Sequence, residues 1–98
     1  MTVRFLTPAS NELVQAIQYY EDQRIGLGRE FLLEIEQVVD LITSFPSSWP
    51  IYTGNLRRAL VKRFPFGLFY RVTQKEIVVA AVMDLRRDPD AVSHRNSD

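Results

Sequence analysis

Residues 77–83 have the sequence Ile77-Val78-Val79-Ala80-Ala81-Val82-Met83, which is apolar at every position. A strand without a polar face is typical of the centre of a sheet or of a strand that is covered on both sides. Before it, Gln74-Lys75-Glu76 predicts a tight turn, and the alternating segment 67–73 predicts a strand. A further alternating segment at 58–64, ended by Pro65, predicts another strand. Together these segments indicate a three-stranded antiparallel meander.

The first half of the chain has helical periodicity instead. We expect a first helix that is capped by Thr7, has Pro8 at its first position and runs to about Arg24. Its apolar positions recur at three- and four-residue steps: Ala9, Leu13, Ala16, Ile17 and Tyr20. Gly26-Leu27-Gly28 breaks this helix. A second helix then repeats the spacing with Phe31, Ile35, Val38, Ile42 and Phe45. A loop this short makes the two helices antiparallel, as a helical hairpin.

Val3–Leu6 predicts a short strand before the helices, and the segment from Asp88-Pro89 onward is a polar tail. The sequence therefore predicts an α+β fold: an N-terminal short strand, an α-helical hairpin, a three-stranded antiparallel meander and a short C-terminal tail. With 98 residues, we expect one domain over 1–98.

Composition narrows the class of protein. Hydrophobic residues are 46% and charged residues 24% of the chain, which is typical of a soluble globular protein. No apolar run reaches the length of a membrane span, and the N-terminus lacks a signal-peptide pattern. The absence of cysteine excludes disulfides, thiolate metal sites and a cysteine nucleophile. We therefore expect a cytoplasmic protein that does not associate with membranes.

The net charge is zero, but the two halves differ. Residues 1–49 hold three basic and seven acidic side chains, a formal charge of −4, and residues 50–98 hold nine basic and five acidic, a formal charge of +4. This asymmetry indicates an anionic partner, either a polyanion or an acidic protein, for the second half. The alternative is that the two halves neutralise each other within the fold.

Several kinds of catalytic site are excluded by the residues available. The one histidine, His94, lies in the polar tail, where a serine–histidine–aspartate triad or a zinc site would lack its other members. Gly26-Leu27-Gly28 follows a helix rather than a strand, so it does not fit a dinucleotide-binding loop. We expect neither a cofactor nor a metal.

Basic side chains gather on and after the predicted strands. On an ideal strand Arg58, Leu60, Lys62 and Phe64 share one face, and Ala59, Val61 and Arg63 share the other. Arg86 and Arg87 follow the last strand, Arg95 lies in the tail, and Tyr70 lies among these residues in the sequence. Such a sheet could bind RNA or cleave it without a metal, since arginine stabilises charge on a phosphoryl group. It could equally bind a protein, or be a solvated edge that discourages aggregation.

Seven ordered segments together resemble the RelE/ParE toxin superfamily of bacterial type II toxin–antitoxin modules, often labelled plasmid stabilisation proteins. These are Ala9–Tyr20, Gly26–Phe31, Phe45-Pro46, Arg58, Lys62–Phe66, Tyr70–Val72 and Arg86–Pro89. The resemblance implies a helical hairpin packed on a twisted, mainly antiparallel sheet. It also implies one of two activities: RelE-like members cleave messenger RNA on the ribosome, and ParE-like members inhibit DNA gyrase.

The RelE-like site pattern is only partly present in this sequence. Arg58 matches a basic position on the first strand after the hairpin, and Arg87 matches an arginine beyond the last strand. Gly67 stands where the pattern has an arginine. Ser93 and His94 lie near the position of a C-terminal aromatic residue, and Asp84 stands where this subfamily often has a histidine. The resemblance therefore favours the ParE-like branch.

The sequence thus predicts a ParE-like toxin that binds DNA gyrase and is neutralised by a cognate antitoxin in a toxin–antitoxin hetero-oligomer. The residues expected to bind the antitoxin or the target are Arg58, Lys62, Arg63, Arg86, Arg87 and Arg95. Val14 and Leu33 are expected to be exposed apolar contacts on the helices. One alternative is a ribosome-dependent, metal-independent endoribonuclease that uses Arg58, Arg87 and Tyr70. Another is a non-toxic relative that retains only the fold.

Overall fold

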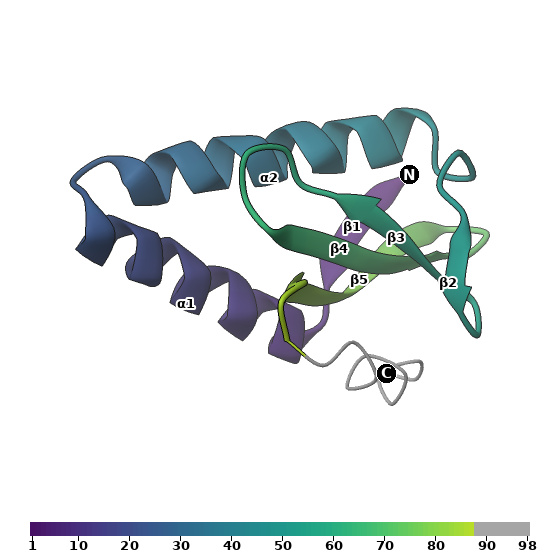
Figure 1. Ribbon diagram of the computed structural model, residues 1–98. Helices are drawn as coiled ribbons and strands as arrows, with labels where there is room; N and C mark the ends of the chain where they lie inside the picture. Colours follow the sequence, from purple (N-terminus) through teal and green to yellow (C-terminus); the bar gives the residue numbers. More distant parts are fainter. Residues whose placement is uncertain (88–98) are drawn as a thin grey trace.

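The computed structural model describes residues 1–87, which form an α+β fold with a helical hairpin beside a five-stranded sheet (Figure 1). The elements in chain order are β1 (Thr2–Phe5), α1 (Thr7–Gln23), α2 (Leu27–Ser44), β2 (Ile51–Thr53), β3 (Leu56–Leu60), β4 (Phe66–Val72) and β5 (Glu76–Asp84). The predicted fold class, the helical hairpin and the two last strands are confirmed. In the described part of the chain, neither helix is long and apolar enough to cross a membrane.

The sheet has the strand order β1-β5-β4-β3-β2. β5 pairs antiparallel with β4 on one side and parallel with β1 on the other, so the first and last strands are neighbours. The pairing with β1 ends where Phe5 meets Val79, and the remaining part of β5 has no strand on that side within residues 1–87. This short first strand leaves a section of sheet edge next to α1.

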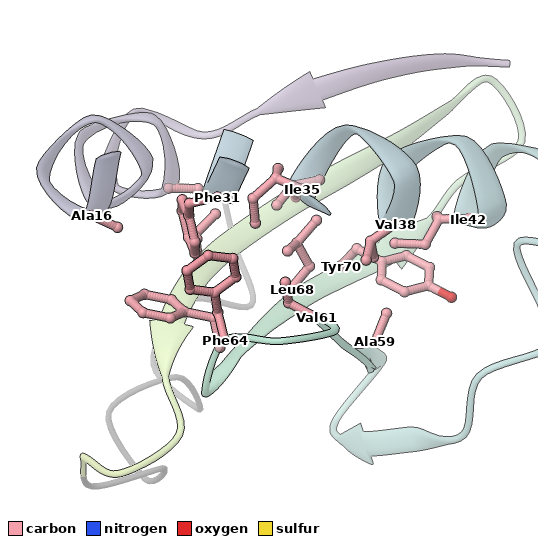
Figure 2. Packing of buried hydrophobic residues seen from close by; sticks show 14 of the residues in the cluster. Ala16, Phe31, Ile35, Val38, Ile42, Ala59, Val61, Phe64, Leu68 and Tyr70 are labelled. Carbon is pink, nitrogen blue, oxygen red and sulfur yellow. The ribbon is translucent and has the colours of Figure 1, made fainter. Parts of the chain in front are cut away.

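The helices pack on one face of the sheet. The core between them includes Phe31, Ile35, Val38 and Ile42 from α2 and Leu68 and Tyr70 from the sheet (Figure 2). Val79 of β5 belongs to the same cluster. The other face carries a smaller cluster that contains no helical residue in the described chain: Leu56, Phe69, Ala80, Ala81 and Met83, with Leu6 and Leu85 packed against it. β5 contributes to both clusters, which explains why its sequence has no polar face.

The turn between the helices depends on glycine and on one carboxylate. Gly26 has a φ of 91°, a left-handed conformation that glycine adopts without steric cost. A Cβ atom on Gly28 would lie 2.7 Å from the carbonyl oxygen of Ile17, so only glycine fits this close approach of the helices. The Glu21 carboxylate accepts hydrogen bonds from the backbone N–H groups of both glycines. It thereby satisfies donors at the start of α2.

The start of α1 differs from the prediction. Leu6 occupies the N-cap position and no side chain caps the helix, whereas Thr7 is already helical. Pro8 is therefore the second helical residue, one position later than predicted, and still lies in the first turn. The backbone N–H of Leu6 donates to Val79, so the chain passes directly from β1 into the helix without an intervening cap.

The predicted strand over 58–64 is wrong at its end, and one strand was not predicted. β3 ends at Leu60, and Arg63 has a φ of 70°, a left-handed conformation that breaks the two-residue alternation. Phe64 therefore packs in the helix-side core instead of sharing a face with Arg58. The additional strand β2 is only three residues long, and it pairs with β3 at the far edge of the sheet.

Candidate partner-binding site

A pocket of about 640 Å³ lies between α1 and the end of β5, beside the short first strand. Its apolar lining consists of Ala16, Phe66, Val82 and Met83. Its polar lining consists of Glu12, Gln15, Tyr19, Asp84, Arg86 and Arg87. Two of the predicted binding residues, Arg86 and Arg87, therefore meet in one concave site.

Arg86 is held by Asp84 rather than offered to a partner. Its guanidinium donates to both carboxylate oxygens, at 2.9 Å from Nε and 2.7 Å from Nη2, and its backbone N–H also donates to Oδ1. These hydrogen bonds from Arg86 hold the pKa of the Asp84 carboxyl below its usual range. The aspartate at this position, which departs from the histidine of the family pattern, is thus the fixed counter-charge of Arg86.

Arg87 remains the available cation of the pocket. Its side chain is exposed, and within residues 1–87 its guanidinium has no hydrogen bond or ion pair. The charge of Arg87 also lowers the pKa of Asp84, but the carboxylate oxygens of Asp84 are hydrogen-bonded to Arg86, so the donors of Arg87 can bond to an incoming carboxylate.

Glu12 closes the sheet edge at the pocket. Its carboxylate accepts a hydrogen bond of 3.0 Å from the backbone N–H of Val82, a donor that would otherwise face no strand. The sequence prediction missed Glu12, Gln15 and Tyr19 as site residues. They are spaced three or four residues apart on α1, but only the tertiary fold brings that helical face to β5.

Arg58 lies on the other face of the sheet. Its guanidinium carbon is 4.8 Å from the ring centroid of Tyr52, a cation–π distance, and that ring packs edge-on against Phe69. A Cβ atom on Gly67 would be 3.1 Å from Leu85 Cδ2 and 3.5 Å from Arg58 Cγ. Leu85 thus fills the space over Gly67, the position where the RelE-like pattern has an arginine.

Arg63 is paired with α2. It donates to Glu30 at 2.7 Å and lies 3.5 Å from Glu34, and Glu30 also accepts from Arg24. The two arginines lower the pKa of the Glu30 carboxyl, Arg63 more than Arg24. Here the acidic first half and the basic second half of the chain neutralise each other. Lys62, next in sequence to Arg63, is exposed.

Tyr70 belongs to the core. Its side chain is fully buried, and its hydroxyl donates to the backbone carbonyl of Pro46 at 2.8 Å. Burial raises the pKa of this hydroxyl. Figure 2 shows the ring in the same cluster as Val38 and Ile42 of α2. The ring therefore has no face on which a nucleobase could stack.

The structure separates the predicted site residues that it describes into four places: the pocket, the second sheet face, the loop beside α2 and, for Tyr70, the helix-side core. Val14 and Leu33 are exposed on the helices, at 65% and 44%, as predicted for apolar contacts. Arg95, Ser93 and His94 lie outside the described residues. No three carboxylate or imidazole side chains gather into a metal-binding group within residues 1–87.

Comparison with known proteins identifies relatives of this fold. The family model described as "ParE toxin of type II toxin-antitoxin system, parDE" matches residues 3–89. Among solved structures, a chain of the chromosomal ParDE toxin–antitoxin system from P. aeruginosa is 21% identical, with a TM-score of 0.61. That match covers 87% of this chain and 96% of the other. A search of curated proteins gave no significant match.

Proposed function

This chain belongs to the ParE toxin family of type II toxin–antitoxin systems, and we propose that it acts in the cytoplasm by binding and inhibiting DNA gyrase. ParE toxins pair with a cognate ParD antitoxin, and we propose that such an antitoxin neutralises this chain in a hetero-oligomer. The matched residues include both helices and the strands of the described chain from Val3 onward, so the family assignment covers nearly all of the described fold.

The observation that carries the choice of a binding toxin over a nuclease is the position of Leu85, whose Cδ2 occupies the space that a side chain on Gly67 would need. RNA cleavage without a metal needs basic groups that converge on one phosphoryl group. At Gly67, the position between Arg58 and the end of β5, an apolar side chain fills the space instead. Losing one donor to a developing charge lowers a rate by about 10²–10³. This face therefore favours binding over catalysis.

The other nuclease candidates support the same choice. Tyr70 is buried and its hydroxyl is bonded to Pro46, so it cannot deliver a proton to a substrate. Arg58 stacks on Tyr52, whereas Arg87 lines the pocket beside α1. The three residues that a nuclease would need in one site thus lie in three different parts of the fold: Tyr70 in the core, Arg58 on the second sheet face and Arg87 at the pocket.

Fewer basic side chains are available to a partner than the sequence predicted. All four of Lys62, Arg63, Arg86 and Arg87 are exposed, but Arg63 and Arg86 form ion pairs with carboxylates of the fold. Lys62 and Arg87 have no ion pair within residues 1–87. We propose that Lys62, Arg87 and the partly exposed Arg58 contact the antitoxin or gyrase, with Arg95 as a further candidate. Charge-assisted contacts of this kind fix orientation and increase association rates.

Controlled expression in a bacterial host, with a DNA-damage reporter in the same culture, tests the proposed target. Gyrase inhibition predicts growth arrest with the reporter switched on, and relief of both effects when the ParD-type antitoxin is co-expressed. In a supercoiling assay with purified gyrase, the toxin should inhibit and the toxin–antitoxin complex should not.

Two results would contradict the proposal in different ways. Arrest with a silent reporter and with cuts at defined codon positions in messages would identify a ribosome-dependent endoribonuclease. Normal growth together with uninhibited gyrase would identify a non-toxic relative.

A further inference from the structure

The pocket between α1 and β5 combines features that suit a peptide better than a nucleic acid. Its polar lining includes two carboxylates, Glu12 and Asp84, which would repel a chain of closely spaced phosphates. Both carboxylates are already bonded within the protein, so they do not require a cation from a partner. A ligand with a single carboxylate and an apolar neighbour avoids that repulsion.

The apolar part of the pocket offers a place for a partner's side chain. Phe66, Val82 and Met83 come from two adjacent strands, and Ala16 on α1 presents only a methyl group to them. Tyr19 lies beside this apolar lining and is 53% exposed. A half-exposed tyrosine next to apolar side chains is typical of a protein interface, because it supplies contact area and a hydroxyl together.

Glu12 determines how a partner can approach. Because its carboxylate occupies the N–H of Val82, the edge of β5 is not free to accept a strand at that position. A partner segment therefore meets side chains in the pocket rather than backbone groups. Of the two arginines that line the pocket, Arg86 is bonded to Asp84, and Arg87 has no ion pair within residues 1–87, so it is placed to receive the carboxylate.

We propose that this pocket is the docking site for a segment of the ParD-type antitoxin that carries one carboxylate next to an apolar side chain. The apolar side chain is seated against Phe66 and Val82, which both belong to the helix-side cluster, and the carboxylate pairs with Arg87. The inference rests on the proposed function, since it names the place where the neutralising partner binds. Charge complementarity supports this occupant. Within residues 1–87 the pocket carboxylates Glu12 and Asp84 are bonded inside the fold and the Arg87 guanidinium has no ion pair, so a carboxylate of the partner would find its counter-charge at Arg87.

The test measures binding of the ParD-type antitoxin encoded beside this chain, by calorimetry, to the wild type and to four variants. Gln15→Trp places a large ring at the pocket from an exposed helix position, and Gln37→Trp makes the same change on the exposed side of α2. Arg87→Glu reverses the pocket charge, and Lys75→Glu makes an equivalent change at the turn before β5, the opposite end of the strand.

We expect Gln15→Trp and Arg87→Glu each to weaken binding about tenfold or more, and Gln37→Trp and Lys75→Glu to change it less than about twofold. Thermal unfolding of each variant separates lost binding from lost folding, and all four changes are at exposed positions. A control pair that weakened binding as much as the pocket pair would overturn the inference.

The proposed function and this inference fail in different ways. If the wild-type chain does not bind the antitoxin, the proposed partnership itself is wrong. If the wild type binds and both pocket variants bind equally well, only the docking site is wrong. If the pocket variants bind the antitoxin normally but no longer inhibit gyrase, the pocket serves the target instead, which also overturns the inference.

Discussion

The carboxylate of Glu12 in α1 accepts a hydrogen bond of 3.0 Å from the backbone N–H of Val82 in β5. Val82 lies beyond Val79, the last residue of β5 that pairs with β1, and its side chain is 1% exposed. The Glu12 carboxylate thus replaces, for the N–H of Val82, the backbone acceptor that a longer β1 would provide. It also fastens the first helix to the central part of the sheet.

Removing this acceptor should destabilise the fold. Glu12→Ala leaves the N–H of Val82 without its acceptor in a place that is partly buried, and we expect a loss of about 1–3 kcal/mol in the free energy of unfolding. Glu12→Gln keeps an amide oxygen that can accept the same bond, so it should lose less than half as much. Urea unfolding measures both. Equal losses for the two variants would show that the hydrogen bond contributes little.

The ion pairs of Glu30 predict a dependence of stability on pH. Because Arg63 and Arg24 lower the pKa of this carboxyl in the folded chain, its stabilising effect is fully present above its ordinary pKa of about 4.3. The effect is lost as the pH falls through the lower, folded pKa. The stability advantage of the wild type over Glu30→Gln should therefore be constant near neutral pH and shrink in acid.

Unfolding in urea at a series of pH values tests this dependence. Glu36→Gln is the matched control, because Glu36 is exposed on the same helix and has no ion pair within residues 1–87. An advantage over Glu30→Gln that persisted unchanged at about pH 3 would contradict the assignment. At that pH the carboxyl of the unfolded chain is largely protonated, so a stabilisation that comes from a lowered folded pKa must already have decreased.

The packing of Leu85 over Gly67 predicts that this position resists a larger residue. Gly67→Arg should lose about 1–3 kcal/mol of unfolding free energy, because the new side chain must displace Leu85. In the double variant with Leu85→Ala, the loss should be smaller than the sum of the two single losses. Chemical unfolding of the four proteins measures the coupling. Strictly additive losses would mean that Leu85 does not exclude an arginine there.

Tyr70 provides a test that separates stability from activity. Tyr70→Phe removes only the hydroxyl that donates to Pro46, and we expect a loss of about 0.5–1.5 kcal/mol in unfolding free energy. Growth arrest should persist, because the residue is buried and has no role in a binding toxin. Tyr52→Phe, at a partly exposed ring, is the control. Loss of arrest in a folded Tyr70→Phe protein would favour the nuclease alternative.

The elements that periodicity alone specifies were predicted from the sequence. Both helices and the strands β4 and β5 have long, regular apolar patterns, and the structure places them within a few residues of the predicted bounds. β2 was missed because three residues give no period to detect. β3 was extended too far because the alternation continues formally through Arg63, whose left-handed backbone nothing in the pattern reveals.

The site was predicted only in part for a related reason. Arg86 and Arg87 are adjacent in sequence, so their common location required no knowledge of the fold. Glu12 lies 70 positions from Val82, and a contact over that distance leaves no local signal. The same holds for Tyr70, whose alternation fits either face of a strand until the helices cover one of them.

The parallel pairing of β1 with β5 governs when this protein becomes complete during synthesis. Arg4 pairs with Glu76 across 72 positions of the chain, so β1 can pair with β5 only after β5 has been synthesised. At about 5–20 residues per second, that interval lasts roughly 4–14 s. Throughout it, the wall that β5 gives to the pocket does not yet exist. The pocket that we propose as a docking site therefore forms only after most of the chain has been made.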